Sequence, residues 1–203
     1  MTFAPPPETA AWRHVAARTG FEVVFFRPLE SGPLEGGHRI EGCTTAVEDL
    51  RTWVVDYAID VDDGWTTRRA RITSRSAAGV RHTLLEADGR GDWLIDGAPA
   101  PHLGDCLDVD LESSALTNAF PVHRMRLAVG AGSAAPAAFV RAADLAVERL
   151  DQHYTRIPDE PDGDARGGPR YDYAAPVFDV SCRLVYDESG LVLDYPGLAV
   201  RAA

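Results

Sequence analysis

The sequence contains no lysine. All 20 of its basic residues are arginine, against 31 acidic residues, and the formal net charge is −11. Proteins bind nucleic acids and anionic membrane surfaces mainly through a basic face, and an excess of acidic residues disfavours such a face. We therefore expect neither a nucleic acid nor an anionic membrane as a partner.

Cysteine is scarce as well. The chain has only Cys43, Cys106 and Cys182, an odd number without paired spacing. This pattern disfavours both a disulfide framework and a zinc site. The six histidines are scattered, and no two are spaced as metal ligands usually are. We expect no bound metal and no other cofactor.

Long hydrophobic runs and the familiar catalytic motifs are also missing. No apolar segment approaches the ~20 residues of a membrane-spanning helix. The first residues, Met1–Glu8, lack the basic and apolar regions of a secretion signal. Together with the unpaired cysteines, this predicts a cytoplasmic protein. Gly-x-Ser-x-Gly, Walker and Rossmann patterns are absent, so no enzyme class is recognisable.

The composition that remains is that of a globular protein. The 203 residues are 45% hydrophobic and 25% charged, enough to bury a sizeable core. We expect one domain over residues 10–203, preceded by a flexible, proline-rich tail over residues 1–9. Residues 159–169, rich in proline, glycine and acids, are expected as a loop.

Alternation of apolar and polar residues predicts most of the chain as β-strands. The clearest run is 51–61, followed by the hairpin signal Asp62-Asp63-Gly64. Its apolar face comprises Trp53, Val55, Tyr57, Ile59 and Val61. Further strands are expected over 21–26, 38–47, 65–74, 80–87, 178–186 and 191–195. The connections are too short for crossover helices, which predicts an antiparallel meander.

Residues 137–154 carry an ambiguous pattern. Ala143, Val147, Leu150 and Tyr154 recur with the spacing of a helical face, whereas Leu145 and Val147 also suit a strand. Periodicity and length favour a helix, but whether 144–154 is helix or strand stays open.

The stretch from Leu103 to Leu127 contains the densest set of polar groups. Over 107–111 the alternation places Asp108 and Asp110 on one face of a strand. Thr117-Asn118 before Pro121 reads as a turn. Residues 122–129 alternate again, with the two arginines Arg124 and Arg126 on one side. The sequence therefore predicts a strand–turn–strand unit that carries two acids, an amide and two arginines.

The two aspartates allow three interpretations. They could form ion pairs with Arg124 and Arg126 across the hairpin, which would be a structural role. They could accept hydrogen bonds from the hydroxyls of a sugar or other polar head group. Alternatively, two carboxylates at this spacing could hydrolyse a glycosidic bond.

The same stretch resembles a known family. Trp93, the Gly104-x-Cys-x-Asp-x-Asp110 core, Thr117-Asn118, Pro121 and Arg124 are similar to the signature of bacterial proteins known as putative glycolipid-binding proteins, formerly a domain of unknown function. Gln152-x-Tyr154 and the closing 190–196 segment, which contains Tyr195, fit the family too. Phe120-Pro-Val-His123 departs from it, because aliphatic residues and a further arginine are expected there. The resemblance covers 12–201 and implies a β-rich roll related to lipoprotein-carrier folds.

These observations lead to one expected fold and three functions. We expect a mainly β protein whose antiparallel sheet curls into a roll or incomplete barrel, with one or two short helices. Its interior could be a cavity or a filled core. The first function is a carrier or sensor of an amphiphilic small molecule such as a glycolipid, with the tail inside and the polar head at the rim. The alternatives are a glycoside hydrolase and a ligand-free interaction module. The candidate binding residues are Trp93, Asp108, Asp110, Asn118, Arg124, Gln152, Tyr154 and Tyr195.

Overall fold

The computed structural model describes residues 2–16, 18–159 and 168–202. Most of these residues lie in β-strands. In chain order the strands are β1 (Thr9–His14), β2 (Thr19–Pro28), β3 (His38–Glu48), β4 (Arg51–Val61), β5 (Thr67–Ser76), β6 (Gly79–Ala87), β7 (Trp93–Ile95), β8 (Ala98–Pro99), β9 (Asp108–Leu111), β10 (Gly132–Ala134), β11 (Ala137–Val140), β12 (Val147–Leu150), β13 (His153–Ile157), β14 (Arg170–Ala175), β15 (Val180–Tyr186), β16 (Val192–Tyr195) and β17 (Ala199–Arg201).

Helices are few and short. The described residues contain one α-helix, α1 (Ala119–Met125), and three 3₁₀ turns, η1 (Pro101–Leu103), η2 (Leu116–Asn118) and η3 (Pro176–Phe178). The expectation of a mainly β protein with one or two short helices is confirmed. The loop expected over 159–169 falls mostly outside the described residues.

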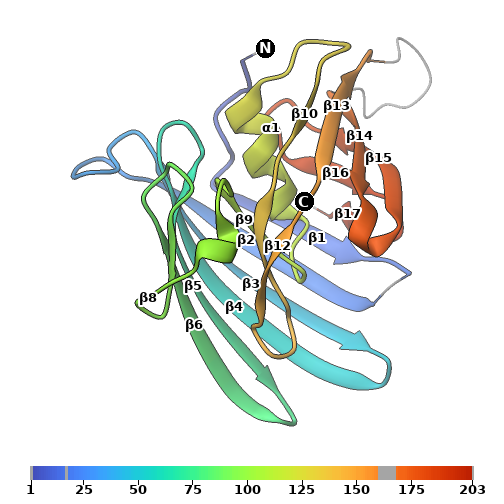
Figure 1. Cartoon of the computed structure of the whole chain (residues 1–203). Helices are drawn as coiled ribbons and strands as arrows, with labels where there is room; N and C mark the ends of the chain where they lie inside the picture. Colours follow the sequence, from blue (N-terminus) through green and yellow to red (C-terminus); the bar gives the residue numbers. More distant parts are fainter. Residues whose placement is uncertain (1, 17, 160–167, 203) are drawn as a thin grey trace.

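One large antiparallel sheet forms the wall of the molecule. Its strand order is β10-β13-β14-β15-β16-β17-β1-β2-β3-β4-β5-β6-β7-β8, so the first strand pairs with the last at its centre. Consecutive hairpins build the β1–β6 part, as the meander predicts. Figure 1 shows this sheet curling around the middle of the molecule without closing into a barrel. The expected curled sheet is therefore confirmed.

The hollow of the curled sheet is occupied by the chain itself. A second sheet of three strands, β12-β11-β9, lies there together with helix α1 (Figure 1). Strands β9 and β11 pair in parallel, and all four residues of each are buried. The side chain of Thr67 on β5 binds β9 through the backbone N–H of Val109, at 3.0 Å. Most of the interior is therefore a packed core.

The apolar face expected for 51–61 is buried as predicted. Trp53, Val55, Tyr57, Ile59 and Val61 are each at most 6% exposed. The expectation for residues 178–186 is wrong at its start. Phe178 lies in η3 and is 38% exposed. Within β15 the alternation is kept, but only Leu184 and Tyr186 are fully covered.

The second half of the predicted strand–turn–strand unit is wrong, because 119–125 form helix α1. Pro121 falls in the first turn, where a proline costs no intrahelical hydrogen bond. The five consecutive residues 119–123 are all buried, which does not match the one-sided burial of an alternating strand. The period-2 alternation over 122–129 was therefore coincidental. Arg126 ends the helix with φ +46°.

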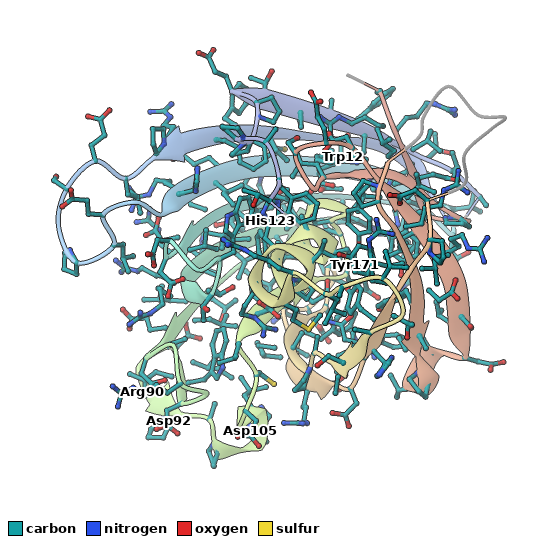
Figure 2. The ribbon with its side chains drawn as sticks, turned by 90° about the horizontal axis from the view of Figure 1, so that it is seen from above. Trp12, Arg90, Asp92, Asp105, His123 and Tyr171 are labelled. Carbon is teal, nitrogen blue, oxygen red and sulfur yellow. The ribbon has the colours of Figure 1, made fainter. Side chains whose placement is uncertain are left out.

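His123, part of the segment that departs from the family pattern, is a core residue. Its ring stacks on Trp65 with centroids 3.6 Å apart, and its Nε2 lies 2.9 Å from the carbonyl oxygen of Ser189. Burial lowers the pKa of His123 to about 3, so the ring is neutral. Figure 2 shows His123 and Tyr171 inside the curl, while Arg90, Asp92 and Asp105 lie at its periphery.

The N-terminal segment expected as a flexible tail contacts the same region. The ring of Phe3 lies 4.6 Å from that of His123, and the N–H of Ala4 donates to the carbonyl of Glu188 at 2.9 Å. Strand β1 begins at Thr9. The segment is thus tied to helix α1 and to the turn before β16.

The ambiguous segment 137–154 resolves into strands, so the helix favoured by periodicity is wrong. It comprises β11, β12 and the start of β13. Strand β11 pairs with β9 on one side and with β12 on the other, and Leu145 adopts φ +59° in the connecting turn. These pairings between distant segments decide the structure, and local periodicity does not contain them.

Candidate functional site

The first candidate pair, Asp108 and Arg124, forms a buried bidentate ion pair. Arg124 donates to both carboxylate oxygens, from Nε at 3.1 Å and from Nη2 at 2.5 Å. The Asp108 side chain is only 1% exposed. Burial raises the pKa of Asp108, and the guanidinium acts in the opposite direction. The structural interpretation of this pair is confirmed, although it joins β9 to a helix rather than to a second strand.

Asp110 has a different environment. Its Oδ1 accepts a hydrogen bond of 2.8 Å from Thr117. No hydrogen bond to its Oδ2 occurs among the described residues, and the residue is 7% exposed. Burial raises the pKa of Asp110 to about 6, with Thr117 acting in the opposite direction. Among the described residues no arginine pairs with Asp110, so the ion-pair interpretation fails for this aspartate. Arg126 instead donates to the carbonyl of His123.

The segment between β9 and α1 is anchored by a third buried acid, Glu22 on β2. It accepts hydrogen bonds from the hydroxyls of Tyr57 and Ser114 and from the backbone N–H of Ala115. Burial raises the pKa of Glu22 because the charged form loses its water, and the hydrogen bonds from Ser114 and Tyr57 act in the opposite direction. These bonds fix the turn that leads from Asp110 to Asn118.

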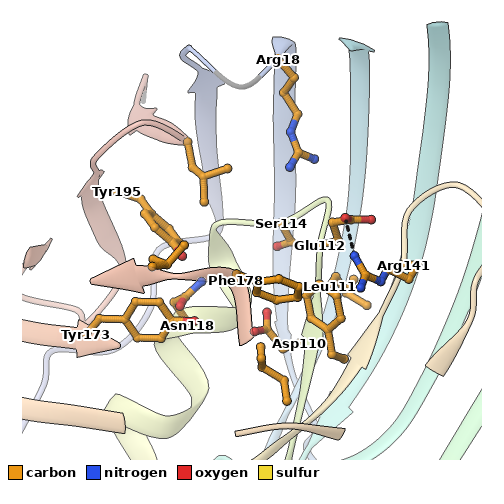
Figure 3. Close-up of a pocket in the computed structure, with 14 residues that line it drawn as sticks. Arg18, Asp110, Leu111, Glu112, Ser114, Asn118, Arg141, Tyr173, Phe178 and Tyr195 are labelled. Carbon is orange, nitrogen blue, oxygen red and sulfur yellow. Dashed lines mark hydrogen bonds and ion pairs between the residues drawn. The ribbon is translucent and has the colours of Figure 1, made fainter. Parts of the chain in front are cut away.

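Asn118 belongs to a buried polar network. Its Oδ1 accepts a hydrogen bond of 3.0 Å from Tyr154, whose hydroxyl also lies 3.4 Å from Oε1 of Gln152. The backbone carbonyl of Asn118 accepts from Tyr186 at 3.2 Å. Thr117-Asn118 forms the turn η2, and the network turns the amide nitrogen of Asn118 towards an adjacent cavity (Figure 3). The candidates Gln152 and Tyr154 thus hold the Asn118 side chain in place on the side away from the cavity.

That cavity has a volume of about 210 Å³ and lies where the two hydrophobic core clusters meet. It is lined by residues from the β1–β2 connection, β9, the segment between β9 and α1, the β11–β12 hairpin, η3 and the C-terminal strands (Figure 3): Arg18, Asp110, Leu111, Glu112, Ser114, Asn118, Phe139, Arg141, Leu150, Tyr173, Phe178, Val180, Tyr195 and Leu198. Three of the predicted site residues, Asp110, Asn118 and Tyr195, therefore share one cavity.

The buried part of the cavity wall is mixed, because the apolar Leu111, Phe139 and Leu150 are as deeply buried there as the polar residues. Asp110, Asn118, Tyr173 and Tyr195 are at most 7% exposed, whereas Phe178 is 38% exposed. Next to Phe178, the guanidinium of Arg141 lies 5.3 Å from the Phe178 ring.

Arg141 also belongs to a half-exposed ion-pair cluster. Its guanidinium lies 3.4 Å from Glu112 and 3.3 Å from Glu148. The second oxygen of Glu112 accepts from the backbone N–H of Ala142 at 2.7 Å. Both oxygens of Glu112 are therefore engaged.

Trp93 and Asp108 lie away from this cavity. The indole of Trp93 is 3% exposed and donates to the carbonyl of Cys106 at 2.8 Å. It lines a separate open groove of about 640 Å³ between β6 and η1. The candidate residues thus fall into three groups. Asp110, Asn118 and Tyr195 line the cavity, and Gln152 and Tyr154 hold Asn118 in place. Trp93, Asp108 and Arg124 have structural roles.

Several lining residues were not predicted. Arg18, Phe139, Arg141, Tyr173 and Phe178 come from four separate segments. Sequence reasoning missed them because each segment shows an ordinary strand or loop pattern. The pairing of β11 with β9 brings Phe139 opposite Asp110. Only the weak Tyr-x-Tyr repeat at 171–173 hinted at an aromatic wall.

Among the described residues, no group of three or more His, Cys, Asp or Glu side chains is placed to hold a metal ion. In the same part of the chain, none of the helices has the length and apolar character needed to cross a membrane.

Fold and site together define a class of β-rich protein with an incompletely closed sheet and a mixed polar and apolar cavity. The family described as "Putative glycolipid-binding" matches residues 9–201, nearly the whole chain, and the chain belongs to that family. The resemblance seen in the sequence is thereby confirmed. No curated protein matches the chain.

Two solved structures are similar to this one. The crystal structure of a DUF1089 family protein from Pseudomonas aeruginosa has 31% sequence identity and a TM-score of 0.72, over 89% of this chain and 92% of that chain. A β-barrel-like protein of domain of unknown function DUF1849 from Brucella abortus has 10% identity and a TM-score of 0.51, over 98% and 96%. The second is a likeness of fold alone.

Proposed function

We propose that this protein binds an amphiphilic small molecule through the cavity beside β9, with a glycolipid-like head group inside. One observation carries the proposal. A buried carboxylate with a free oxygen, Asp110, and the amide of Asn118 face the same cavity. A carboxylate accepts hydrogen bonds from hydroxyls and an amide nitrogen donates them, which suits a polyhydroxylated group. The family description supports the same class of ligand.

Aromatic side chains add to the fit. The cavity wall includes Tyr173, Tyr195, Phe139 and Phe178. Aromatic rings present flat apolar faces, and tyrosine adds a hydroxyl, so they suit a ligand that is polar on its edges and apolar on its faces. A sugar ring has this character.

The size of the cavity limits how much of the ligand it encloses. Its volume of about 210 Å³ is below the ~300–1,000 Å³ of sites that enclose a whole drug-sized ligand. Only a head group or a short part of an amphiphile is enclosed. The burial of Asp110 and Asn118 and the exposure of Phe178 favour the head group at the two buried polar residues and the chain towards Phe178. This reverses the arrangement expected from the sequence.

The binding test compares octyl glucoside with glucose and with octanol by isothermal titration calorimetry. The octyl glucoside is kept below its critical micelle concentration, at pH 7.5. We expect the glucoside to bind more tightly than either fragment, because each buried methylene contributes about 0.8 kcal/mol and the head group adds hydrogen bonds.

Variants locate the site. Asn118→Ala removes a neutral hydrogen bond worth ~1 kcal/mol, so binding should weaken roughly 5-fold. Asp110→Asn removes a charged acceptor worth ~1.5–3 kcal/mol, so binding should weaken roughly 10- to 100-fold. The control Asp56→Asn lies in an exposed ion pair with Arg75 on the wall of the sheet and should bind as wild type. Absence of binding, or binding unaffected by both cavity variants, would end the proposal.

The two alternatives receive less support. The hydrolase interpretation needs Asp108 and Asp110 in one cavity, but Asp108 is held by Arg124 and does not line it. The interaction-module interpretation is favoured by a filled interior. Most of the described interior is filled, but the cavity beside β9 leaves room for part of a ligand, which favours binding.

A further inference from the structure

Arg18, on the wall of the cavity, has a buried and poorly satisfied guanidinium. Its side chain is only 5% exposed, and neither Nε nor Nη1 has a hydrogen-bond partner among the described residues. The nearest carboxylate, of Glu48, lies 4.0 Å away, beyond hydrogen-bond distance. The guanidinium lies 5.3 Å from the Trp53 ring. Figure 3 shows the side chain reaching from one end of the cavity towards its interior.

A buried cation without a hydrogen-bonded partner is costly, because it has lost its water and gained nothing equivalent. The ion pair with Glu48 at 4.0 Å and the contact with the Trp53 ring offset this cost only in part, because neither supplies a hydrogen bond to Nε or Nη1. Burial, assisted by the charge of Arg18, lowers the pKa of His14 to about 4, so this neighbour is neutral at pH 7. The carboxylate of Glu112 also lines the cavity, but its oxygens are engaged by Arg141 and by the N–H of Ala142.

We propose that Arg18 binds an anionic group of the ligand, a carboxylate, sulfate or phosphate, so that the cavity selects acidic over neutral head groups. This inference rests on the proposed function. A guanidinium offers paired N–H donors whose geometry matches such oxyanions, and hydrogen bonds to charged groups are about twice as strong as neutral ones. The ligand therefore supplies the partner that the chain leaves out.

The positions of the charges also orient the ligand. Asp110 faces the cavity from β9 and Arg18 from the end of the β1–β2 connection. An acidic group would be repelled by ionised Asp110, whereas hydroxyls can donate to it. The acidic group therefore lies at Arg18 and the hydroxyls at Asp110. A glycoside carrying both, such as a uronic acid glycoside, satisfies both ends.

The test compares octyl glucoside with octyl glucuronide, which differ only in the CH₂OH or carboxylate group on the ring, together with free glucuronate. Affinities are measured by calorimetry at pH 7.5 and at two salt concentrations. We expect wild-type protein to prefer the glucuronide at least 10-fold, as a charged hydrogen bond worth ~1.5–3 kcal/mol implies. The preference should shrink at high salt, since screening weakens charge pairs.

Variants assign the preference to Arg18. Arg18→Gln should abolish this preference, so that the two glycosides bind the variant with similar affinities. Arg18→Lys should retain part of it, because the charge remains without the paired donors. Arg27→Gln, on the exposed surface, should behave as wild type. If Arg18→Gln does not fold, the proposal is tested by two results: the preference of wild type for the glucuronide, and a reduced preference in Arg18→Lys.

The outcomes separate the two proposals. Equal affinities of wild type for both glycosides, or a preference that survives in Arg18→Gln, overturn the anionic site but leave amphiphile binding intact. Failure of both glycosides to bind overturns both. If free glucuronate binds as tightly as octyl glucuronide, the anion site is supported, and a lipid is disfavoured as the source of the acidic group.

Discussion

Replacing Arg124 with alanine should lower the free energy of unfolding by about 3–5 kcal/mol, because it leaves the carboxylate of Asp108 buried without its partner. The carboxylate is 1% exposed and receives two hydrogen bonds from the guanidinium. Water cannot replace them at this depth, so the variant must bury an unpaired charge or take up a proton. Urea denaturation at pH 7 measures the change.

A double-mutant cycle supplies the control. The variant Asp108→Asn/Arg124→Ala should be more stable than Arg124→Ala alone, since neither charge is then stranded. Arg75→Ala breaks an exposed ion pair with Asp56 and should cost less than about 1 kcal/mol. A loss below 1 kcal/mol for Arg124→Ala, with no coupling to Asp108, would show that the pair does not stabilise the β9–α1 junction.

The stability of Asp110→Asn relative to wild type should rise by about 2–2.5 kcal/mol as the pH is raised from 4 to 7. The reason is the raised pKa of Asp110, which burial moves from 3.8 to about 6. Below pH 3.8 both folded and unfolded chains carry the proton. Between pH 3.8 and 6 only the folded chain keeps it, so wild-type stability falls as the pH rises through this window.

The comparison is made by urea denaturation of wild type and Asp110→Asn at pH values from 4 to 7. The free energy of unfolding is plotted against pH for each protein, and the two curves are subtracted. This cancels the contributions of all groups that titrate alike in wild type and variant. A difference independent of pH would mean that Asp110 is not in the dry environment described. If ionised Asp110 destabilises the ligand-free protein, it resembles functional groups in other proteins, which often cost stability.

The large sheet could be predicted from sequence because its signals are local. The alternation of Trp53, Val55 and Tyr57 and the turn at Asp62-Asp63-Gly64 each involve residues close in the chain. The pairing of β1 with β17, which closes the middle of the sheet, brings Trp12 opposite Arg201 and has no local signal.

The candidate site was predicted only in part. Asp110 and Asn118 stand out as polar residues in an apolar context, and both line the cavity. Helix α1 was missed because 122–129 alternates with period two, whereas the structure buries the consecutive residues 119–123. Arg18 could not be found at all. Its significance lies in the hydrogen-bond partners that it lacks in the fold, which a sequence of 20 arginines does not show.

The central claim, that an amphiphile's head group enters the cavity beside Asn118, has a direct test by NMR. Asn118 is the only asparagine of the chain and Gln152 the only glutamine, so the side-chain NH₂ region of a ¹H–¹⁵N spectrum contains two pairs of signals. The pair missing from Asn118→Ala identifies Asn118. Titration of wild-type protein with octyl glucoside, and then with octyl glucuronide, should shift this pair and saturate with the dissociation constant found by calorimetry. If the glycosides bind but the Asn118 pair stays unmoved, while backbone signals shift around the groove of Trp93 instead, the head group does not enter this cavity and the account is wrong.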